Sequence, residues 1–134
     1  MKRVVGILDS YSEAQDLQND LVRSGFKGDD INIVRHEPEG KKSFFQRIKE
    51  LFGAEEVPEE QRELYAEGVR RGGILVSVDT EDKDADRAAQ IMSRHGAIDI
   101  EKRAEYWRQA GWNRFDEKAK PFTAQEIDRE KKFL

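Results

Sequence analysis

Two short apolar runs constrain the fold of this chain most, because both have the pattern of strands buried on both faces. They are RVVGIL at residues 3–8 and GILVSVD at residues 73–79. Continuous apolar stretches of this length, bounded by turn residues, are typical of central strands. Two further segments, DINIVR at 30–35 and AIDIE at 97–101, alternate apolar and polar residues, as half-buried edge strands do. The sequence therefore predicts four strands, with the first and third at the centre.

Helical patterns separate these four segments. Ser10–Glu13 has the spacing of a capping box, and Gly25 is placed to end the helix that starts there. Between the second and third strands we expect two helices, over 44–52 with Gly53 as its stop, and over 58–71. A further helix of small apolar residues follows the third strand. Strand and helix segments thus alternate along most of the chain.

This order of elements fits a ferredoxin-like α/β sandwich of the α+β class, with two strand–helix–strand halves and antiparallel edges. The helices at 44–71 are then an insertion between the second and third strands. A flavodoxin-like parallel sheet is the main alternative, but it explains the alternating strands less well. Two helices cover one face of such a sheet, so we expect Val4, Leu8 and Leu75 on the other face. That face would be covered by the inserted helices, by the segment around Trp107, or by another subunit.

Residues 113–134 are polar and have few apolar anchors. Such a segment gains little from burial to offset the entropy of ordering it. We therefore predict a domain at 1–112 followed by a charged C-terminal tail at 113–134, in which Thr123 and Glu126 have the spacing to cap a marginal helix.

Composition narrows the class of protein. The chain has 134 residues and no cysteine, so disulfides, thiolate metal sites and cysteine nucleophiles are excluded. Charged residues make up 39% of the sequence, yet the net charge is only -4; mixed charge of this kind is typical of a solvated surface and not of a nucleic-acid binder. No apolar stretch approaches the length of a membrane span or a signal-peptide core. We expect a cytoplasmic protein without nucleic-acid partners.

The run GVRRGG at 68–73 raises the question of a phosphate-binding loop. Such loops follow a strand and precede a helix, so that helix N-terminal amides face the anion. Here the order is reversed, with a predicted helix before the glycines and a predicted strand after them. The arginines then suit the negative end of the helix dipole, and Gly72 the helix stop. The sequence favours a helix end over an anion site.

Catalytic and metal-binding patterns are weak. His36 and His95 are the only histidines, and two histidines without a matched ligand spacing do not predict a metal site. The carboxylates are many but show no paired pattern, and there is no nucleophile motif. We therefore predict no catalytic residues, no cofactor and no metal, and a protein that is not an enzyme.

Aromatic residues are the best candidates for partner binding. One helical face at 44–52 carries aromatic and aliphatic side chains beside basic residues, and two tryptophans lie in a segment, 102–112, that we expect to form a short helical turn. Such stripes usually pack within their own domain, but aromatic residues are also enriched in interface anchors. The candidate partner-binding residues are Phe44, Phe45, Ile48, Leu51, Phe52, Trp107 and Trp112.

Four motifs in this sequence resemble the bacterial heat-induced or general stress protein domain, the YflT-like family, over about residues 3–112. The motifs are DSYSEA at 9–14, GVRRGG at 68–73, HGAIDI at 95–100 and WRQAGW at 107–112. The resemblance implies a small cytoplasmic stress-associated domain, and it brings no catalytic residues. We expect a non-enzymatic stress-response module that acts through protein–protein contacts and self-associates, with a dimer favoured. The alternative is a metabolite-sensing domain that binds its ligand at a subunit interface.

Overall fold

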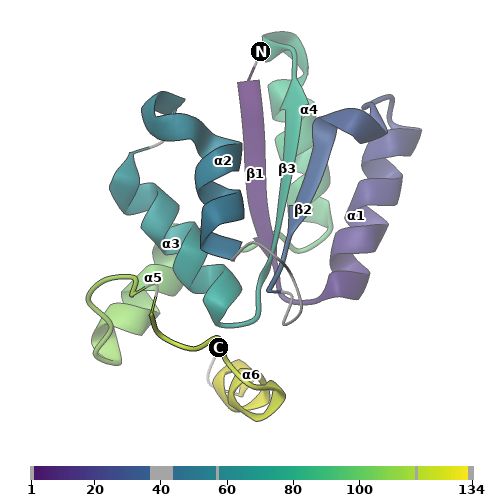
Figure 1. The fold of residues 1–134 in the computed structure, drawn as a ribbon. Coiled ribbons are helices and arrows are strands. Elements are labelled where there is room, and N and C mark those ends of the chain that lie inside the picture. Colours follow the sequence, from purple (N-terminus) through teal and green to yellow (C-terminus); the bar gives the residue numbers. More distant parts are fainter. Residues whose placement is uncertain (1, 37–43, 57, 117, 133–134) are drawn as a thin grey trace. The chain divides into compact units, whose positions relative to one another are not determined.

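The computed structural model describes residues 2–36, 44–56, 58–116 and 118–132. The chain divides into two compact units, each built from two stretches of sequence (Figure 1). The sheet unit comprises 1–33 and 74–99, and the helical unit comprises 34–73 and 100–134. The domain boundary after residue 112 stays a prediction.

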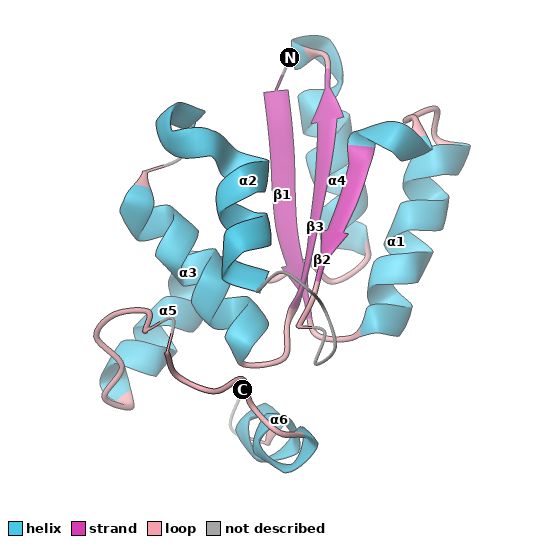
Figure 2. Ribbon diagram, viewed as in Figure 1, coloured by secondary structure: helices cyan, strands magenta, loops and turns pink. Residues whose placement is uncertain are grey.

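The sheet has three strands in the order β1-β3-β2 (Figure 2). They are β1 (Lys2–Leu8), β2 (Ile31–Val34) and β3 (Ile74–Thr80). β1 and β3 are antiparallel and pair along their whole length, from Lys2 with Thr80 to Leu8 with Ile74. The predicted α+β class and the first three predicted strands are confirmed.

The described residues show three strands of the predicted four-stranded sheet, and the fourth is not shown as a strand. Residues 97–101 contribute a single antiparallel bridge, between Ile98 and Ile7, in which the Ile98 amide donates to the Ile7 carbonyl at 2.8 Å. Helix α5 (Ile100–Gln109) begins two residues later. The alternating pattern of this segment is only five residues long, and the helix-favouring residues that follow it determine the conformation from Ile100 onward.

Helices α1 (Tyr11–Arg23) and α4 (Ala85–Arg94) lie against one face of this sheet. α1 begins as predicted, because the Ser10 hydroxyl accepts a hydrogen bond from the Glu13 amide, and Gly25 follows its end with φ 102°. Short 3-10 turns, Gly28–Asp30 and Asp82–Asp84, precede β2 and α4. The apolar core between helices and sheet contains Leu8, Ala14, Leu17, Leu21, Phe26, Ile31, Ile74, Val76, Val78, Ala88, Ile91 and Met92.

The expected facing of the first strand was wrong. Val4 pairs with Val78 and Leu8 with Ile74, so these side chains share the face that α1 and α4 cover; Leu8 belongs to that core and Val4 packs against it. In an antiparallel pair, directly opposite residues point to the same side. The opposite face instead carries Leu75, as predicted, and the Arg3–Asp79 ion pair at 2.7 Å.

The helical unit contains α2 (Phe44–Glu56), α3 (Glu59–Arg70), α5 and α6 (Ala124–Lys131). α2 continues past Gly53, which was predicted to end it. The Phe52 ring stacks on Tyr65 of α3, with ring centroids 5.6 Å apart. Among the described residues, none of the helices has the length and apolar character needed to cross a membrane.

Within the sheet unit, α1 and α4 are linked by a hydrogen bond between side chains. His95 Nε2 lies 2.8 Å from Asp20 Oδ2, and this hydrogen bond lowers the pKa of Asp20 below its ordinary value. Because the folded-state pKa is depressed, the pair stabilises the fold above the unfolded-state pKa, and the stabilisation is lost as pH falls through the folded-state pKa.

We predict that Asp20→Asn lowers the melting temperature at neutral pH, and that its difference from the wild type shrinks toward zero in acid. Thermal melts across that pH range measure the effect. Asp16→Asn, an exposed substitution on the same helix, serves as the control and should change the melting temperature little. A deficit of Asp20→Asn that stays constant into acid would contradict the role of the Asp20–His95 pair.

Candidate functional site

The GVRRGG run ends helix α3 and does not form an anion-binding loop. Gly72 has φ 104°, the left-handed conformation that glycine adopts after a helix. Its amide donates to the Val69 carbonyl at 3.0 Å, and the Gly73 amide donates to the Gly68 carbonyl at 2.8 Å. These two amides are therefore engaged by the carbonyls of the helix end. This agrees with the helix-end interpretation of the sequence.

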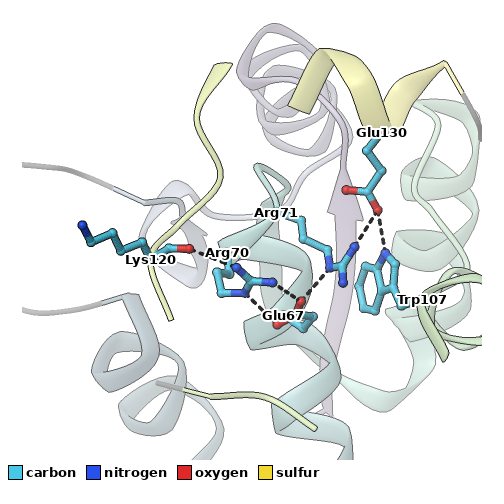
Figure 3. Close-up of polar contacts among 6 residues, drawn as sticks. All are labelled: Glu67, Arg70, Arg71, Trp107, Lys120 and Glu130. Atoms are coloured by element: carbon cyan, nitrogen blue, oxygen red, sulfur yellow. Dashed lines mark hydrogen bonds and ion pairs between the residues drawn. The ribbon is translucent and has the colours of Figure 1, made fainter. Parts of the chain in front are cut away.

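A buried carboxylate lies beside this helix end. The Glu67 side chain is only 1% exposed, and both of its oxygens are paired with guanidinium groups (Figure 3). Arg70 donates to it twice, from Nε at 2.9 Å and from Nη2 at 2.7 Å. Arg71 Nε donates to Oε2 at 2.6 Å. The hydrogen bonds to Glu67 raise the pKa of Arg70 above its ordinary value, so the buried acid is held between two permanent positive charges.

Arg71 extends this network to the C-terminal helix. Its Nη1 donates to Glu130 Oε1 of α6 at 3.0 Å. The indole Nε1 of Trp107, on α5, donates to the same oxygen at 2.9 Å. Figure 3 shows the indole and the guanidinium converging on this carboxylate from two elements. One acid of α6 is thus bound by donors from α3 and α5.

The segment before α6 also contacts the end of α3. The Phe122 amide donates to the Arg70 carbonyl at 2.7 Å, and Arg70 Nη1 donates to the Lys120 carbonyl at 3.0 Å. The Phe122 ring lies 5.0 Å from the Arg70 guanidinium carbon and 5.2 Å from that of Arg71. These are cation–π distances.

Gly72 makes room for the apolar side of α6. A Cβ placed on Gly72 would lie 2.5 Å from Cδ1 and 2.7 Å from Cγ1 of Ile127, which is closer than carbon atoms approach without displacement. The helix itself begins with the predicted cap, because Thr123 and Glu126 form a reciprocal capping box. We call the residues that receive α6, namely Arg70, Arg71, Gly72 and Trp107, the α6 docking surface.

Only some residues of this site were predicted from the sequence. Trp107 was a candidate, whereas Glu67, Ile127 and Glu130 were not. The available signal was local: Glu67 precedes Arg70 by three residues and Arg71 by four, the spacing of ion pairs on one helix face. Nothing local pairs Arg71 with Glu130, which is 59 residues away.

The candidate partner-binding residues fall into two groups in the structure. Ile48, Phe52 and Trp107 are buried. Phe44, Phe45, Leu51 and Trp112 are partly exposed. Their assignment to partner binding stays a prediction.

Two of the partly exposed residues form a cluster with a third aromatic ring. Phe45 and Phe115 have ring centroids 4.7 Å apart, and Phe44 lies 6.1 Å from Phe115 in an edge-on arrangement. Lys49 Nζ lies 4.3 Å above the Phe45 ring. We call Phe44, Phe45 and Phe115 the aromatic cluster; Phe115 was not singled out from the sequence.

Trp112 lies against Trp107, with ring centroids 5.7 Å apart at 72°. Its indole nitrogen is buried and has no hydrogen-bond partner among the described residues. Arg108 lies over its ring at 5.9 Å. The two tryptophans thus differ, because the Trp107 N–H donates to Glu130 whereas the described residues offer the Trp112 N–H no acceptor.

Few side chains in the part of the chain that the structure describes are placed to bind a metal ion or to act in catalysis. No group of three or more histidine and acidic side chains is placed to hold a metal ion there. His95 forms a hydrogen bond with Asp20. The rings of His36 and Phe44 pack in an edge-to-face arrangement, with centroids 6.0 Å apart. One shallow surface depression lies on α4 beside Ala89 and Arg94.

The chain was compared with protein-family models, with curated proteins and with solved structures, and none of these matches it. The motif resemblance to the general stress protein domain therefore stays a prediction.

We predict that Gly72→Ala destabilises the fold more than Gly111→Ala does. Both glycines have positive φ, 104° and 106°, so each substitution should lose about 1 kcal/mol through backbone strain. A Cβ on Gly111 meets nothing within 4 Å, whereas one on Gly72 meets Ile127. Urea unfolding of both variants measures the excess. In an Ile127→Ala background the excess should disappear, and equal losses in the wild-type background would contradict the contact.

We also predict that Arg71→Ala lowers the free energy of unfolding by about 1.5–3 kcal/mol, because it removes one charge-assisted hydrogen bond from a buried carboxylate that Arg70 still neutralises. Arg129→Ala, on the exposed side of α6, is the control and should change it by less than about 0.5 kcal/mol. Denaturant melts of the two variants test this. Similar small losses for both would mean that Arg71 has no structural role beyond its position at the helix end.

Proposed function

We propose that this chain is a non-enzymatic module of the bacterial general stress response that acts in the cytoplasm through protein–protein contacts and self-associates as a dimer. The observation that supports self-association best is the aromatic cluster of the helical unit. Phe44 and Phe45 stay partly exposed beside a basic residue, although they gather around Phe115, which is 8% exposed.

The chemistry of this cluster suits an interface. Aromatic side chains are enriched in interface cores, where they offer large contact area with few rotatable bonds. Burying one such side chain contributes about 1.5–3 kcal/mol. A two-fold dimer would bring two copies of the cluster together with one set of contacts used twice.

We also propose that the sheet is of the ferredoxin-like type. In a ferredoxin-like sheet the fourth strand lies beside the first, on the side away from the third. Ile98 makes its antiparallel bridge to Ile7 of β1, and β3 occupies the other side of β1. This position favours a ferredoxin-like sheet whose fourth strand is shortened to one bridge.

The stress-response part of the proposal rests on the four motifs that resemble the general stress protein domain. Their residues take structural roles: Ser10 caps α1, and Gly72 and Gly96 follow helix ends with positive φ. Structural roles of this kind fit a domain that presents surfaces and carries out no reaction.

We predict that Phe45→Glu weakens the dimer by roughly tenfold to a hundredfold, the change in dissociation constant that corresponds to losing about 1.5–3 kcal/mol of aromatic burial. Sedimentation velocity over a concentration series measures the dissociation constant. Val22→Glu is the matched control, because Val22 is a 48% exposed apolar residue of α1 in the sheet unit.

A wild type that remains monomeric at tens of micromolar would refute self-association. If Val22→Glu separates the subunits and Phe45→Glu does not, the dimer forms, but through α1 and not through the aromatic cluster.

A further inference from the structure

The α6 docking surface has the properties of a binding site for a helix. We propose that it is a receptor for an acidic amphipathic helix of a partner protein, in which an apolar residue precedes a glutamate by three positions, and that α6 occupies this receptor until the partner displaces it. The inference rests on the proposed function, since it names a second surface for protein contacts and the kind of partner that fits it.

The polar half of the receptor selects a carboxylate. Arg71 Nη1 and Trp107 Nε1 come from different helices and meet at one oxygen of Glu130, at 3.0 and 2.9 Å. Arg71 already pairs with Glu67 through its Nε, and its planar guanidinium leaves Nη1 to donate to a second carboxylate. Glu67 holds Arg71 and Trp112 packs against the Trp107 ring, so each donor has a contact outside α6 that fixes it, and preorganisation of this kind reduces the entropy lost on binding.

The apolar half selects a side chain one helical turn earlier. Residues three apart lie on the same face of a helix, and Ile127 therefore reaches the docking surface together with Glu130. It fits because Gly72 has no Cβ in the space that the Ile127 side chain fills. The docking surface therefore fits a helix in which an isoleucine lies over the glycine and a glutamate three residues later reaches the carboxylate site.

The helix that now occupies the receptor is suited to being displaced. α6 has eight residues, a length at which a helix has little stability of its own. Ile127 and Glu130 are partly buried, whereas Gln125, Asp128 and Arg129 are exposed. α6 acts at the high effective concentration of a tethered ligand, so it sets a threshold that only a partner with better or more numerous contacts passes.

The test uses the full chain and, as probe, a fluorescein-labelled synthetic peptide with the sequence of residues 119–132. Fluorescence anisotropy gives its affinity for the wild type, for Glu130→Gln and for the double variant Ile127→Ala, Glu130→Gln. Apparent affinity falls in proportion to the fraction of open receptor. We therefore expect at least tenfold tighter binding to the double variant than to the wild type, with the single variant between them.

The peptide itself carries the matched controls. A peptide with Glu130→Gln should lose most of its binding to the double variant, whereas one with Asp128→Asn, which removes the same charge from the exposed side of α6, should keep it. If the double variant fails to fold, the comparison of Glu130→Gln with the wild type still tests the proposal. Equal affinity for all three chains, or equal binding of both substituted peptides, would overturn the receptor.

A second copy of this chain is the other possible occupant of the docking surface, and light scattering tests it in the Phe45→Glu background, which removes the proposed dimer contact. Phe45→Glu chains are mixed with chains that carry Phe45→Glu together with Ile127→Ala and Glu130→Gln. Dimers that form in this mixture, and not with the triple variant alone, would overturn the assignment to a foreign helix and show that α6 of a second copy binds the docking surface. Failure of the peptide test is distinguishable from failure of the proposed function, because self-association through the aromatic cluster is measured on Phe45→Glu and does not involve α6.

Discussion

The carboxylate of Glu67 is the group on which the helical unit depends. Almost entirely removed from solvent, it would destabilise the fold by several kcal/mol if it were left without a counter-charge. Two consecutive arginines at the end of α3 supply that charge, and each then has donors left over. Arg70 uses one on the Lys120 carbonyl, and Arg71 uses one on Glu130. The requirement to neutralise one buried acid therefore fixes the side chains that hold the C-terminal segment.

Features that depend on local pattern were predictable from the sequence. The N-cap at Ser10 and the glycines after α1 and α3 act within a few residues, and the structure has them where the sequence predicts them. The apolar runs that became β1 and β3 were equally clear. The helix-end interpretation of the paired glycines could be made from the order of elements alone.

Features that depend on pairing between distant residues were not predictable. The facing of Val4 and Leu8 depends on which residues of β3 lie opposite them, and the alternating side-chain pattern of one strand does not contain that register. The predicted fourth strand is represented by the single Ile98–Ile7 bridge, because helix α5 begins at Ile100. The docking of α6 could not be predicted, because its anchors are few and widely spaced in a polar segment: Phe122, Ile127 and Glu130. Their partners lie in α3 and α5, so no window of sequence contains both sides of the contact.

The pairing of β1 with β3 also has a consequence for the kinetics of folding. The Arg3–Asp79 pair joins residues 76 positions apart, and the helices α1, α2 and α3 lie in the intervening chain. Bringing such distant segments together loses loop entropy before any ladder hydrogen bond compensates for it. We therefore expect the helices to gain structure first and the β1–β3 ladder to limit the folding rate. Until that ladder closes, the apolar β3 segment lacks one of its two partner strands, and the time to closure is the interval in which this chain is most exposed to aggregation.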